Sequence, residues 1–368
     1  MTILLLNINI GKPWGWGGIE SHSEILACAL VKKGHHVIVG CWNGGEVTLK
    51  SMPATLPARR VTIRNSGDLR AILKLVQISL EEHVDIIIAN HGREFWPAAI
   101  AAKLARARVI FVRHQTDRLK SITCWLINIM VDKIVAVSSA VKDALLTSGV
   151  ENKKIEVISN GIDLERFNPL TIDAADERKK LGIASTDKVV GTVGKLNRGK
   201  GVYEVLYAVN NLTRQFPSLK LLFVGEGPEH QGLKAEAEKL SIAEKVIFTG
   251  VRHDIEHMYA VMDVFVLPST CQEAFGMVII EAMAMQRPVI GTMVGGISDI
   301  IKNQVNGLLI PPGDESALAD AIKRYLNDGK FAKKIAFEGR KMVECNFSDV
   351  SMGEKFERIF NSIVGDSR

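Results

Sequence analysis

Short apolar runs rich in β-branched residues alternate with longer segments of helical periodicity along the whole 368-residue chain. A continuous apolar run, rather than a polar/apolar alternation, indicates a strand that is buried on both faces. Strands of this kind occur in parallel sheets whose two faces are covered by helices. We therefore predict an α/β fold in which strands and helices alternate from end to end.

The strands expected in the first half are Ile3–Ile8, His36–Cys41, Asp85–Ala89, Val109–Val112, Lys133–Val137 and Ile155–Ile158. Those expected in the second half are Val189–Val193, Lys220–Val224, Val246–Phe248, Val264–Leu267, Pro288–Gly291 and Gly307–Ile310. Helices are expected between them, for example Ile19–Lys33, Leu69–Glu82, Gly201–Gln215 and Met277–Met285. A polar stretch without strand pattern, Phe167–Ala184, predicts the break between two Rossmann-like domains with a cleft between them.

Composition limits the class of protein and its compartment. Hydrophobic residues make up 47% and charged residues 24%, as in ordinary globular proteins. The five cysteines are not spaced as metal ligands, and the apolar N-terminal run is too short to span a membrane, so we expect a cytoplasmic protein. The net charge is +5, and the positive excess lies in residues 1–168. This excess indicates either an anionic partner or a scattered solvated surface, and no basic cluster typical of nucleic-acid binding is present.

The first candidate motif is the glycine-rich loop Gly11–Glu20, between a predicted strand and a predicted helix. A dinucleotide-binding loop would be paired with an acidic residue at the end of the second strand, which here ends VIVGCW. Nicotinamide binding is therefore disfavoured. Gly17 and Gly18 would let the backbone approach a ligand closely. Alternatively, these glycines only allow the chain to form a turn.

The second motif, Val189–Gly201, is again a strand followed by a glycine-rich loop. It lacks the spacing of a P-loop, so a nucleoside-triphosphate hydrolase is disfavoured. Lys195 and Lys200 could neutralise a diphosphate at the carboxyl end of the strand, and the alternative is a solvated basic turn.

The third motif, Leu267–Ile290, combines a strand, an acidic loop and an apolar helix. The amides of Phe275–Val278 would form an anion site at the start of that helix. Glu273 and Glu281 would be unfavourable beside a phosphate unless they bind ligand hydroxyls, which indicates a sugar or a ribose. The alternative for Glu281 is an exposed helix position.

The segment from Glu273 to Glu281 resembles the Glu-x7-Glu motif of the retaining glycosyltransferases of family 4, which have the GT-B fold. Four further segments match in the family's order: Gly17–Glu20, Val157–Asp163, Gly194–Leu196 with Lys200 and Gly201, and Val224–Pro228. The resemblance implies a GT-B architecture of two Rossmann-like parallel-sheet domains that face each other across a cleft. It places an acceptor-side domain at residues 1–168, a donor domain at 169–346, and a C-terminal helix at 347–368 that crosses back to the first domain.

The resemblance also implies residue roles in transferring a sugar from a nucleotide diphosphate-sugar with retention at the anomeric carbon. Lys195 and Lys200 would hold the diphosphate, Glu281 the ribose, and Glu273 hydroxyls of the sugar. His114 would face the donor sugar, or else be a locally satisfied loop histidine. The implied catalytic residues are Glu273, His114, Lys195 and Lys200; the implied donor-binding residues are Gly17, Gly18, Gly194, Lys195, Lys200, Val251, Arg252, Glu273, Ala274, Phe275, Gly276, Met277, Val278 and Glu281. The family usually has arginine where Lys195 stands, so one phosphate contact loses the planar guanidinium fork.

No Asp-x-Asp sequence occurs in the chain, so we expect neither a metal at the diphosphate nor another cofactor. The family implies same-face attack with the donor phosphate as base, and Glu273 as a positioning group. We expect a UDP-sugar donor and a glycan or lipid-linked acceptor in cell-surface polysaccharide or lipopolysaccharide synthesis. A sugar-nucleotide epimerase and a non-catalytic sugar-nucleotide sensor of the same fold remain as alternatives.

The segment Arg113–Met130 has apolar residues at helical spacing beside Arg118 and Lys120. Such a segment could lie in the interface of the inner membrane leaflet and receive a lipid-linked glycan. The alternative is an amphipathic helix packed on its own sheet.

Overall fold

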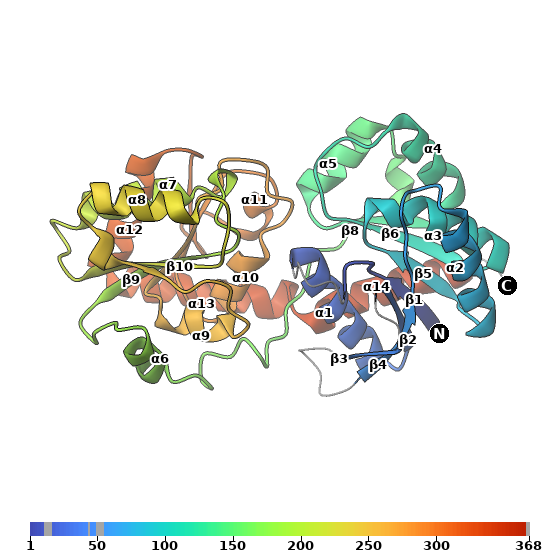
Figure 1. Cartoon of the computed structure of the whole chain (residues 1–368), viewed down its shortest axis with the longest axis horizontal. Helices are drawn as coiled ribbons and strands as arrows, with labels where there is room; N and C mark the ends of the chain where they lie inside the picture. Colours follow the sequence, from blue (N-terminus) through green and yellow to red (C-terminus); the bar gives the residue numbers. More distant parts are fainter. Residues whose placement is uncertain (11–16, 43–44, 49–54, 366–368) are drawn as a thin grey trace. The chain divides into compact units, whose positions relative to one another are not determined.

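A computed structural model describes residues 1–10, 17–42, 45–48 and 55–365. The chain divides into two compact units: unit 1 is Met1–Asp163 with Asn346–Arg368, and unit 2 is Leu164–Cys345. Each unit is built on one sheet with helices on its faces (Figure 1). The predicted α/β fold with two Rossmann-like parallel-sheet domains is confirmed.

Unit 1 contains an eight-stranded sheet in the order β3-β4-β2-β1-β5-β6-β7-β8. Its strands are β1 (Thr2–Leu6), β2 (His36–Cys41), β3 (Gly45–Thr48), β4 (Thr55–Arg60), β5 (Ile86–Ala89), β6 (Arg108–Arg113), β7 (Lys133–Ala136) and β8 (Ile155–Val157). Its helices are α1 (Gly18–Lys32), α2 (Leu69–Glu81), α3 (Gly92–Ala105), α4 (Ser121–Met130), α5 (Ser139–Ser148) and α14 (Asp349–Gly365), with a 3₁₀ turn η1 (Asn152–Lys154). All strand pairs are parallel except β3 with β4.

Helix α14 brings the end of the chain back to unit 1, where it packs beside α1 (Figure 1). Asp349 binds Lys32 of α1 at 2.9 Å, and the Ile162 N–H donates to the Phe347 carbonyl at 2.8 Å. Phe356 and Phe360 of α14 are fully buried. The last helix is therefore part of the core of unit 1.

Unit 2 contains a six-stranded parallel sheet in the order β11-β10-β9-β12-β13-β14. Its strands are β9 (Lys188–Val193), β10 (Leu219–Val224), β11 (Val246–Phe248), β12 (Val264–Leu267), β13 (Val289–Thr292) and β14 (Leu308–Ile310). Its helices are α6 (Ala174–Lys180), α7 (Val202–Leu212), α8 (His230–Lys239), α9 (Ile255–Val261), α10 (Met277–Ala284), α11 (Ile297–Ile300), α12 (Glu315–Asn327) and α13 (Gly329–Asn346), with 3₁₀ turns η2 (Arg198–Lys200) and η3 (Ala243–Lys245).

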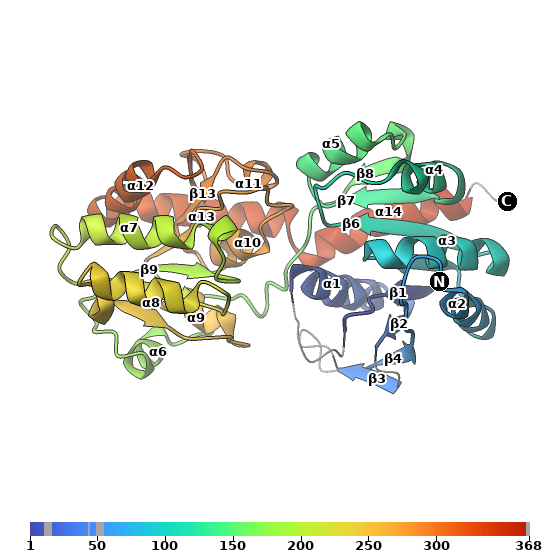
Figure 2. The ribbon, with the colours of Figure 1, turned by 45° about the horizontal axis from the view of Figure 1, so that its top comes forward.

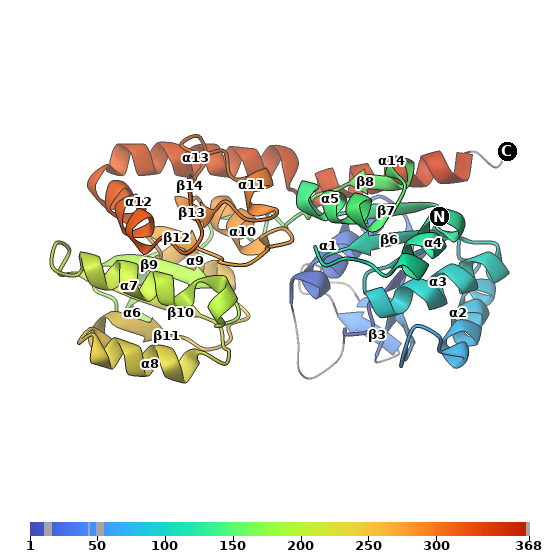
Figure 3. The ribbon, with the colours of Figure 1, turned by 90° about the horizontal axis from the view of Figure 1, so that it is seen from above.

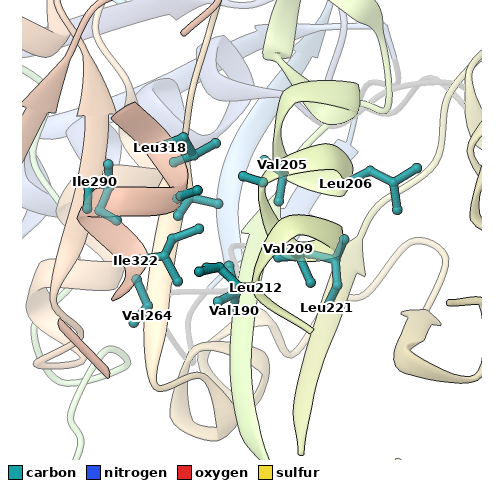
Figure 4. Packing of buried hydrophobic residues seen from close by; sticks show 14 of the residues in the cluster. Val190, Val205, Leu206, Val209, Leu212, Leu221, Val264, Ile290, Leu318 and Ile322 are labelled. Carbon is teal, nitrogen blue, oxygen red and sulfur yellow. The ribbon is translucent and has the colours of Figure 1, made fainter. Parts of the chain in front are cut away.

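One face of this sheet is closed by α7, α8 and α12. Figure 4 shows Val205 and Val209 of α7 and Ile322 of α12 directed toward Val190 and Val264 of the sheet. These side chains are essentially inaccessible to solvent. Burying them stabilises the unit by roughly 1.5–3 kcal/mol for each large aliphatic side chain.

Strands β3 and β4 were not anticipated from the sequence. They lie at one edge of the sheet of unit 1, visible in Figure 2. β4 reads TLPARR, with Pro57 and two arginines, so it lacks the apolar run of a central strand. Proline removes a ladder donor and is tolerated only where one side of a strand is free or bulged, which suits an edge hairpin.

Among the residues that the structure describes, no helix is long and apolar enough to cross a membrane.

Candidate functional site

The strand order of unit 2 changes direction between β9 and β12, and the loops after these two strands hold most of the predicted donor-binding residues. Connections from β9 and from β12 lead to opposite sides of the sheet, and ligands of open parallel sheets bind at such a switch point, outside the carboxyl ends of the strands. Gly194, Lys195 and Lys200 follow β9, and Glu273 follows β12. The fold therefore brings the second and third sequence motifs to one edge of the sheet.

Glycines let these loops approach one another backbone to backbone. Gly201 has a φ of 72°, and a Cβ there would lie 1.9 Å from the Pro268 carbonyl oxygen. Gly295 has a φ of 50°, and its Cβ would lie 2.0 Å from the Glu273 carbonyl oxygen, which accepts a 2.8 Å hydrogen bond from the Gly296 N–H. A side chain at either glycine would push the Glu273 loop away from its place beside β9.

The centre of this edge is an ion pair between the Lys200 Nζ and the Glu273 Oε2. The Ser269 hydroxyl lies 3.4 Å from the same carboxylate oxygen, and the Asn197 side chain accepts a 3.1 Å hydrogen bond from the Lys200 N–H. The side chains of Lys200 and Glu273 stay 32% and 17% exposed, so a ligand could reach both. Lys195 is exposed and has no ion-pair partner in the described part of the chain.

Helix α10 begins directly after the Glu273 loop. Gly276 caps it with a φ of 106°, and the amides of Met277 and Val278 fall in its first turn, where N–H groups have no acceptor within a helix. Glu281, in the second turn, is only 7% exposed and accepts a 2.7 Å hydrogen bond from the Tyr259 hydroxyl. Burial raises the pKa of Glu281, and the hydrogen bond from Tyr259 opposes this rise. Glu281 is therefore an interior carboxyl group, contrary to the alternative of an exposed helix position.

Ala274 and the buried Phe275 connect Glu273 to Gly276. Val251 and Arg252 follow β11, two strands away from β9. The Arg252 guanidinium binds Asp254 at 2.6 Å and Glu177 at 3.0 Å, whereas Val251 is 66% exposed. The charge of Arg252 is thus already balanced within the unit, and donor binding by Val251 and Arg252 stays a prediction.

The first predicted loop is only partly visible, because residues 11–16 lie outside the described residues. Gly17 donates its N–H to the Glu20 Oε2 at 3.0 Å, and α1 starts at Gly18. The other oxygen of Glu20 lies 3.5 Å from the His91 Nε2. Burial acts to raise the pKa of Glu20, but hydrogen bonds from His91 and other donors hold it below its ordinary value. Glu20 therefore ties the start of α1 to the loop after β5.

His114 follows β6 at the same edge of unit 1 and lies 3.3 Å, through its Nε2, from the Asn90 Oδ1. The Asn90 Nδ2 donates to the Leu6 carbonyl at 2.9 Å, so the Oδ1 of that amide is the acceptor turned toward His114. Burial, and then the neighbouring His22, His91 and Arg113, hold the pKa of His114 well below its ordinary value. A neutral ring that donates through Nε2 leaves Nδ1 as a hydrogen-bond acceptor.

His22 of α1 supports this ring. It is fully buried, and its ring meets that of His114 edge-on, with centroids 4.7 Å apart. On its other side lies Phe356 of α14, at 6.3 Å. Burial lowers the pKa of His22 to about 4, and the side chain of Asn160 acts in the opposite direction. Both histidines are therefore neutral near pH 7.

Sequence reasoning missed Asn90, His22 and Tyr259. Asn90 had a usable signal, because it is the first polar residue after the predicted strand Asp85–Ala89. His22 and Tyr259 had none, because each sits in a helix whose pattern does not show that its side chain meets His114 or Glu281. Nowhere in the described ranges do three or more His, Cys, Asp or Glu side chains gather so that they could hold a metal ion.

Two family models match this chain in succession. Residues 16–166 match Glycosyltransferase Family 4, and residues 173–342 match Glycosyl transferases group 1. The chain is also 28% identical to the capsular polysaccharide biosynthesis glycosyltransferase CapM of Staphylococcus aureus over 318 residues, which cover 82% of this chain and 83% of CapM.

Solved structures extend the likeness to the fold of the whole chain. The Anabaena protein Alr3699/HepE, in complex with UDP and glucose, superposes with a TM-score of 0.84 at 26% identity, covering 98% of this chain and 100% of HepE. A glycosyltransferase from Rickettsia africae gives a TM-score of 0.86 at 26% identity, covering 100% of this chain and 99% of the other.

Proposed function

The chain belongs to glycosyltransferase family 4 and has the GT-B fold; from this premise we propose that it transfers a sugar from a UDP-sugar, with retention, to a glycan or lipid-linked acceptor of a cell-surface polysaccharide. HepE, which binds UDP and glucose, supports the choice of donor. CapM, a capsular polysaccharide enzyme, supports the class of acceptor. The proposed reaction is that of a metal-independent hexosyltransferase.

The observation that carries the proposal is the ion pair between Lys200 and Glu273 at the switch point of unit 2. A carboxylate beside a phosphate site would repel the ligand unless it accepts hydrogen bonds from hydroxyl groups. A sugar linked to a diphosphate offers both partners, since its phosphates suit Lys195 and Lys200 and its hydroxyls suit Glu273. In the unliganded protein the two opposite charges satisfy each other.

Catalysis would rest on charge that develops on the departing diphosphate. Lys195, Lys200 and the first turn of α10 would stabilise that charge, as preorganised dipoles and cations do in other transferases. The acceptor would attack from the face that the diphosphate leaves, with a phosphate oxygen taking the proton from the acceptor hydroxyl. Glu273 would then position the sugar without forming a bond to it, and Glu281 would hold the ribose.

His114 fits a role in binding hydroxyls because of its protonation. Its Nδ1 is an acceptor while Asn90 holds the Nε2 proton, so the ring can accept a hydrogen bond from a sugar O–H without adding positive charge. A protonated histidine would instead compete with the lysines for the phosphates.

Helix α4 supports contact with the inner leaflet of a membrane. Ile122, Trp125 and Ile129 are between 52% and 61% exposed, and Arg118 and Lys120 precede the helix and are exposed. Apolar side chains beside cations suit an anionic lipid surface. Sedimentation with vesicles containing anionic lipid tests this, and binding that survives charge reversal at Arg118 and Lys120 together would contradict it.

A thermal-shift screen of UDP, GDP, ADP and dTDP, each with magnesium and with EDTA, tests the donor site. A ligand that binds only the folded state raises the melting temperature, so UDP should stabilise the protein equally in both conditions. Stabilisation that depends on magnesium would contradict metal independence, and the absence of any shift would contradict the donor site.

Donor turnover distinguishes transfer from the alternatives. We expect UDP release that depends on added acceptor, and an α-linked product from an α-linked donor by NMR. Conversion of the donor without acceptor would indicate an epimerase, binding without turnover would indicate a sensor, and a burst of glycosyl-enzyme on Glu273 would contradict same-face attack.

A further inference from the structure

An exposed apolar stripe runs along α2 of unit 1. Leu69, Leu73, Val76 and Leu80 are spaced by four, three and four residues, which places them on one side of the helix. The three leucines are 65%, 59% and 57% exposed, and Val76 is half-buried. The core contacts of α2 are made by other residues, among them Leu75, which is fully buried. The stripe is therefore not needed to hold α2 on its sheet.

Three large leucines in a row on the surface of one helix are unusual, because an amphipathic helix normally turns polar residues outward. Their spacing is that of the seam between two paired helices. On its neighbouring side α2 packs against α3, which lies beside it in Figure 3, so the stripe is available to a further helix.

The charges beside the stripe indicate which helix that is. Arg70 and Lys74, in the first half of α2, lie on the same flank as Glu81 at its end. Gln77 lies between them, accepts from Lys74 at 3.2 Å and donates to Glu81 at 2.7 Å. This flank is positive at one end and negative at the other. An antiparallel copy of the same helix presents the opposite order, so its charges are complementary.

The register follows from the spacing. A two-fold axis midway between Leu73 and Val76 sets Leu69 opposite Leu80 of the second copy, and Leu73 opposite its Val76. With a rise of about 1.5 Å per residue, Arg70 then falls between Gln77 and Glu81 of the second copy, within one helical turn of each. The apolar stripe and the two Arg70–Glu81 pairs are thus compatible with one axis, near which Lys74 donates to Gln77 of its own helix.

We propose that α2 is an isologous interface through which two copies of this chain associate, with the leucine stripes packed antiparallel and Arg70 paired with Glu81 of the second copy. A lipid surface suits this face less well than it suits α4, because an anionic membrane attracts Arg70 and Lys74 but repels Glu81, whereas Arg118 and Lys120 precede α4. The proposal is independent of the reaction that the protein catalyses.

Analytical ultracentrifugation of the full chain over a range of concentrations measures the self-association. The wild type should form a dimer, and Leu69→Ser with Leu73→Ser should raise its dissociation constant at least tenfold. Leu104→Ser is the matched control, since Leu104 of α3 is 61% exposed but lies outside the stripe, and it should leave the constant unchanged. Far-ultraviolet circular dichroism checks that each variant is folded.

Charge reversal gives the sharper test. Arg70→Glu and Glu81→Arg should each weaken the dimer several-fold, and the two together should restore it, because both cross-dimer pairs then regain opposite charges. A monomer at every concentration would overturn the proposal, as would a dimer indifferent to the single reversals. A protein that stays monomeric but binds anionic vesicles through Leu69 and Leu73 would overturn it in favour of a membrane surface.

Discussion

The carboxyl edges of the two sheets both lie at a change in strand order but carry different side chains. In unit 2 the edge carries Lys195, Lys200 and Glu273, which are charged and at least partly exposed. In unit 1 the corresponding edge carries His114 and Asn90, joined by a hydrogen bond, and burial lowers the pKa of His114. The parallel sheet fixes where a ligand can bind, whereas the residues after each strand decide what kind of ligand it is.

The difference also explains how each edge tolerates burial. The charged side chains of unit 2 remain partly exposed to water. There a lysine and a glutamate can pair with each other, or separate and bind a ligand, at a small cost in free energy. In unit 1 burial lowers the pKa of His22 and His114, so these rings stay uncharged, since burial of an unpaired charge would cost several kcal/mol. We expect the edge of unit 2 to bind a charged group of the ligand and the edge of unit 1 to bind hydroxyl groups.

Removing the positive charge of Lys200 in unit 2 should have the largest effect, a loss of catalytic efficiency. Lys200→Ala should lower kcat/KM for the donor by about 10²–10³-fold, the usual loss when a group that stabilises transition-state charge is removed. Steady-state kinetics with UDP-glucose measure it. Arg198→Ala is the matched control, because Arg198 lies two residues away with 80% of its side chain exposed, and it should change kcat/KM by less than about threefold. Equal losses in both variants would show that the loop contributes only general positive charge.

The next largest effect concerns the close backbone contact between Gly201 and Pro268. Gly201→Ala should lower the free energy of unfolding by about 3 kcal/mol, because the new Cβ meets the Pro268 carbonyl in addition to the strain at positive φ. Gly313→Ala isolates the strain, since Gly313 has a φ of 75° with nothing within 4 Å of a Cβ, and should cost only about 1 kcal/mol. Urea denaturation compares the two, and similar losses would contradict the close approach of the loops.

Lowering the pH should destabilise unit 1 through protonation of His22. The pKa of His22 is about 4 in the folded protein, below the ordinary value of about 6.5 expected in the unfolded chain. Between these values the unfolded chain binds more protons, so the stability from His22 is fully present above pH 6.5 and is lost as the pH falls toward 4. We expect a loss of about 2 kcal/mol between pH 7 and pH 5. Urea midpoints of the wild type and His22→Phe measure it, and the same pH dependence in both would contradict a neutral buried His22.

The smallest effect tests Glu281, a buried carboxyl group in the second turn of α10. Tyr259→Phe should cost about 1 kcal/mol, the usual value of a lost hydrogen bond, and more at high pH, because the pKa of Glu281 is raised by burial and loses the contact that lowers it. A folded-state pKa above the unfolded value means that stability falls as the pH rises through it. Tyr325→Phe, which loses a bond to the Val289 carbonyl, should show a similar loss without the pH dependence.

The sequence predicts this architecture because buried parallel strands leave continuous apolar runs, such as Ile86–Ala89 and Val264–Leu267. It does not reveal the hairpin of Gly45–Thr48 and Thr55–Arg60 at the edge of the sheet, because strands at an edge need no such run. The motif around Glu273 is readable because a glycine-rich loop and a helix start carry local signals.

Contacts between distant segments carry no local signal. Tyr259 reaches Glu281 across 22 positions, and Arg252 is balanced by Glu177 across 75. In α4, periodicity alone does not tell that Leu126 is buried while Trp125 is 52% exposed, because the packing direction of the helix is set by the sheet. The roles of the individual site residues in donor binding and catalysis stay predictions.

Unit 1 is assembled from two separate stretches of chain, whereas unit 2 is one uninterrupted stretch. During synthesis on the ribosome, all of unit 2 therefore emerges before α14, which completes the core of unit 1. Until then the α14-facing side of α1, including His22, lacks its cover. Unit 2 can fold completely before unit 1 does. A stalled or shortened chain would therefore leave the part of unit 1 around His22, and not the part of unit 2 around Lys200, accessible to chaperones and proteases.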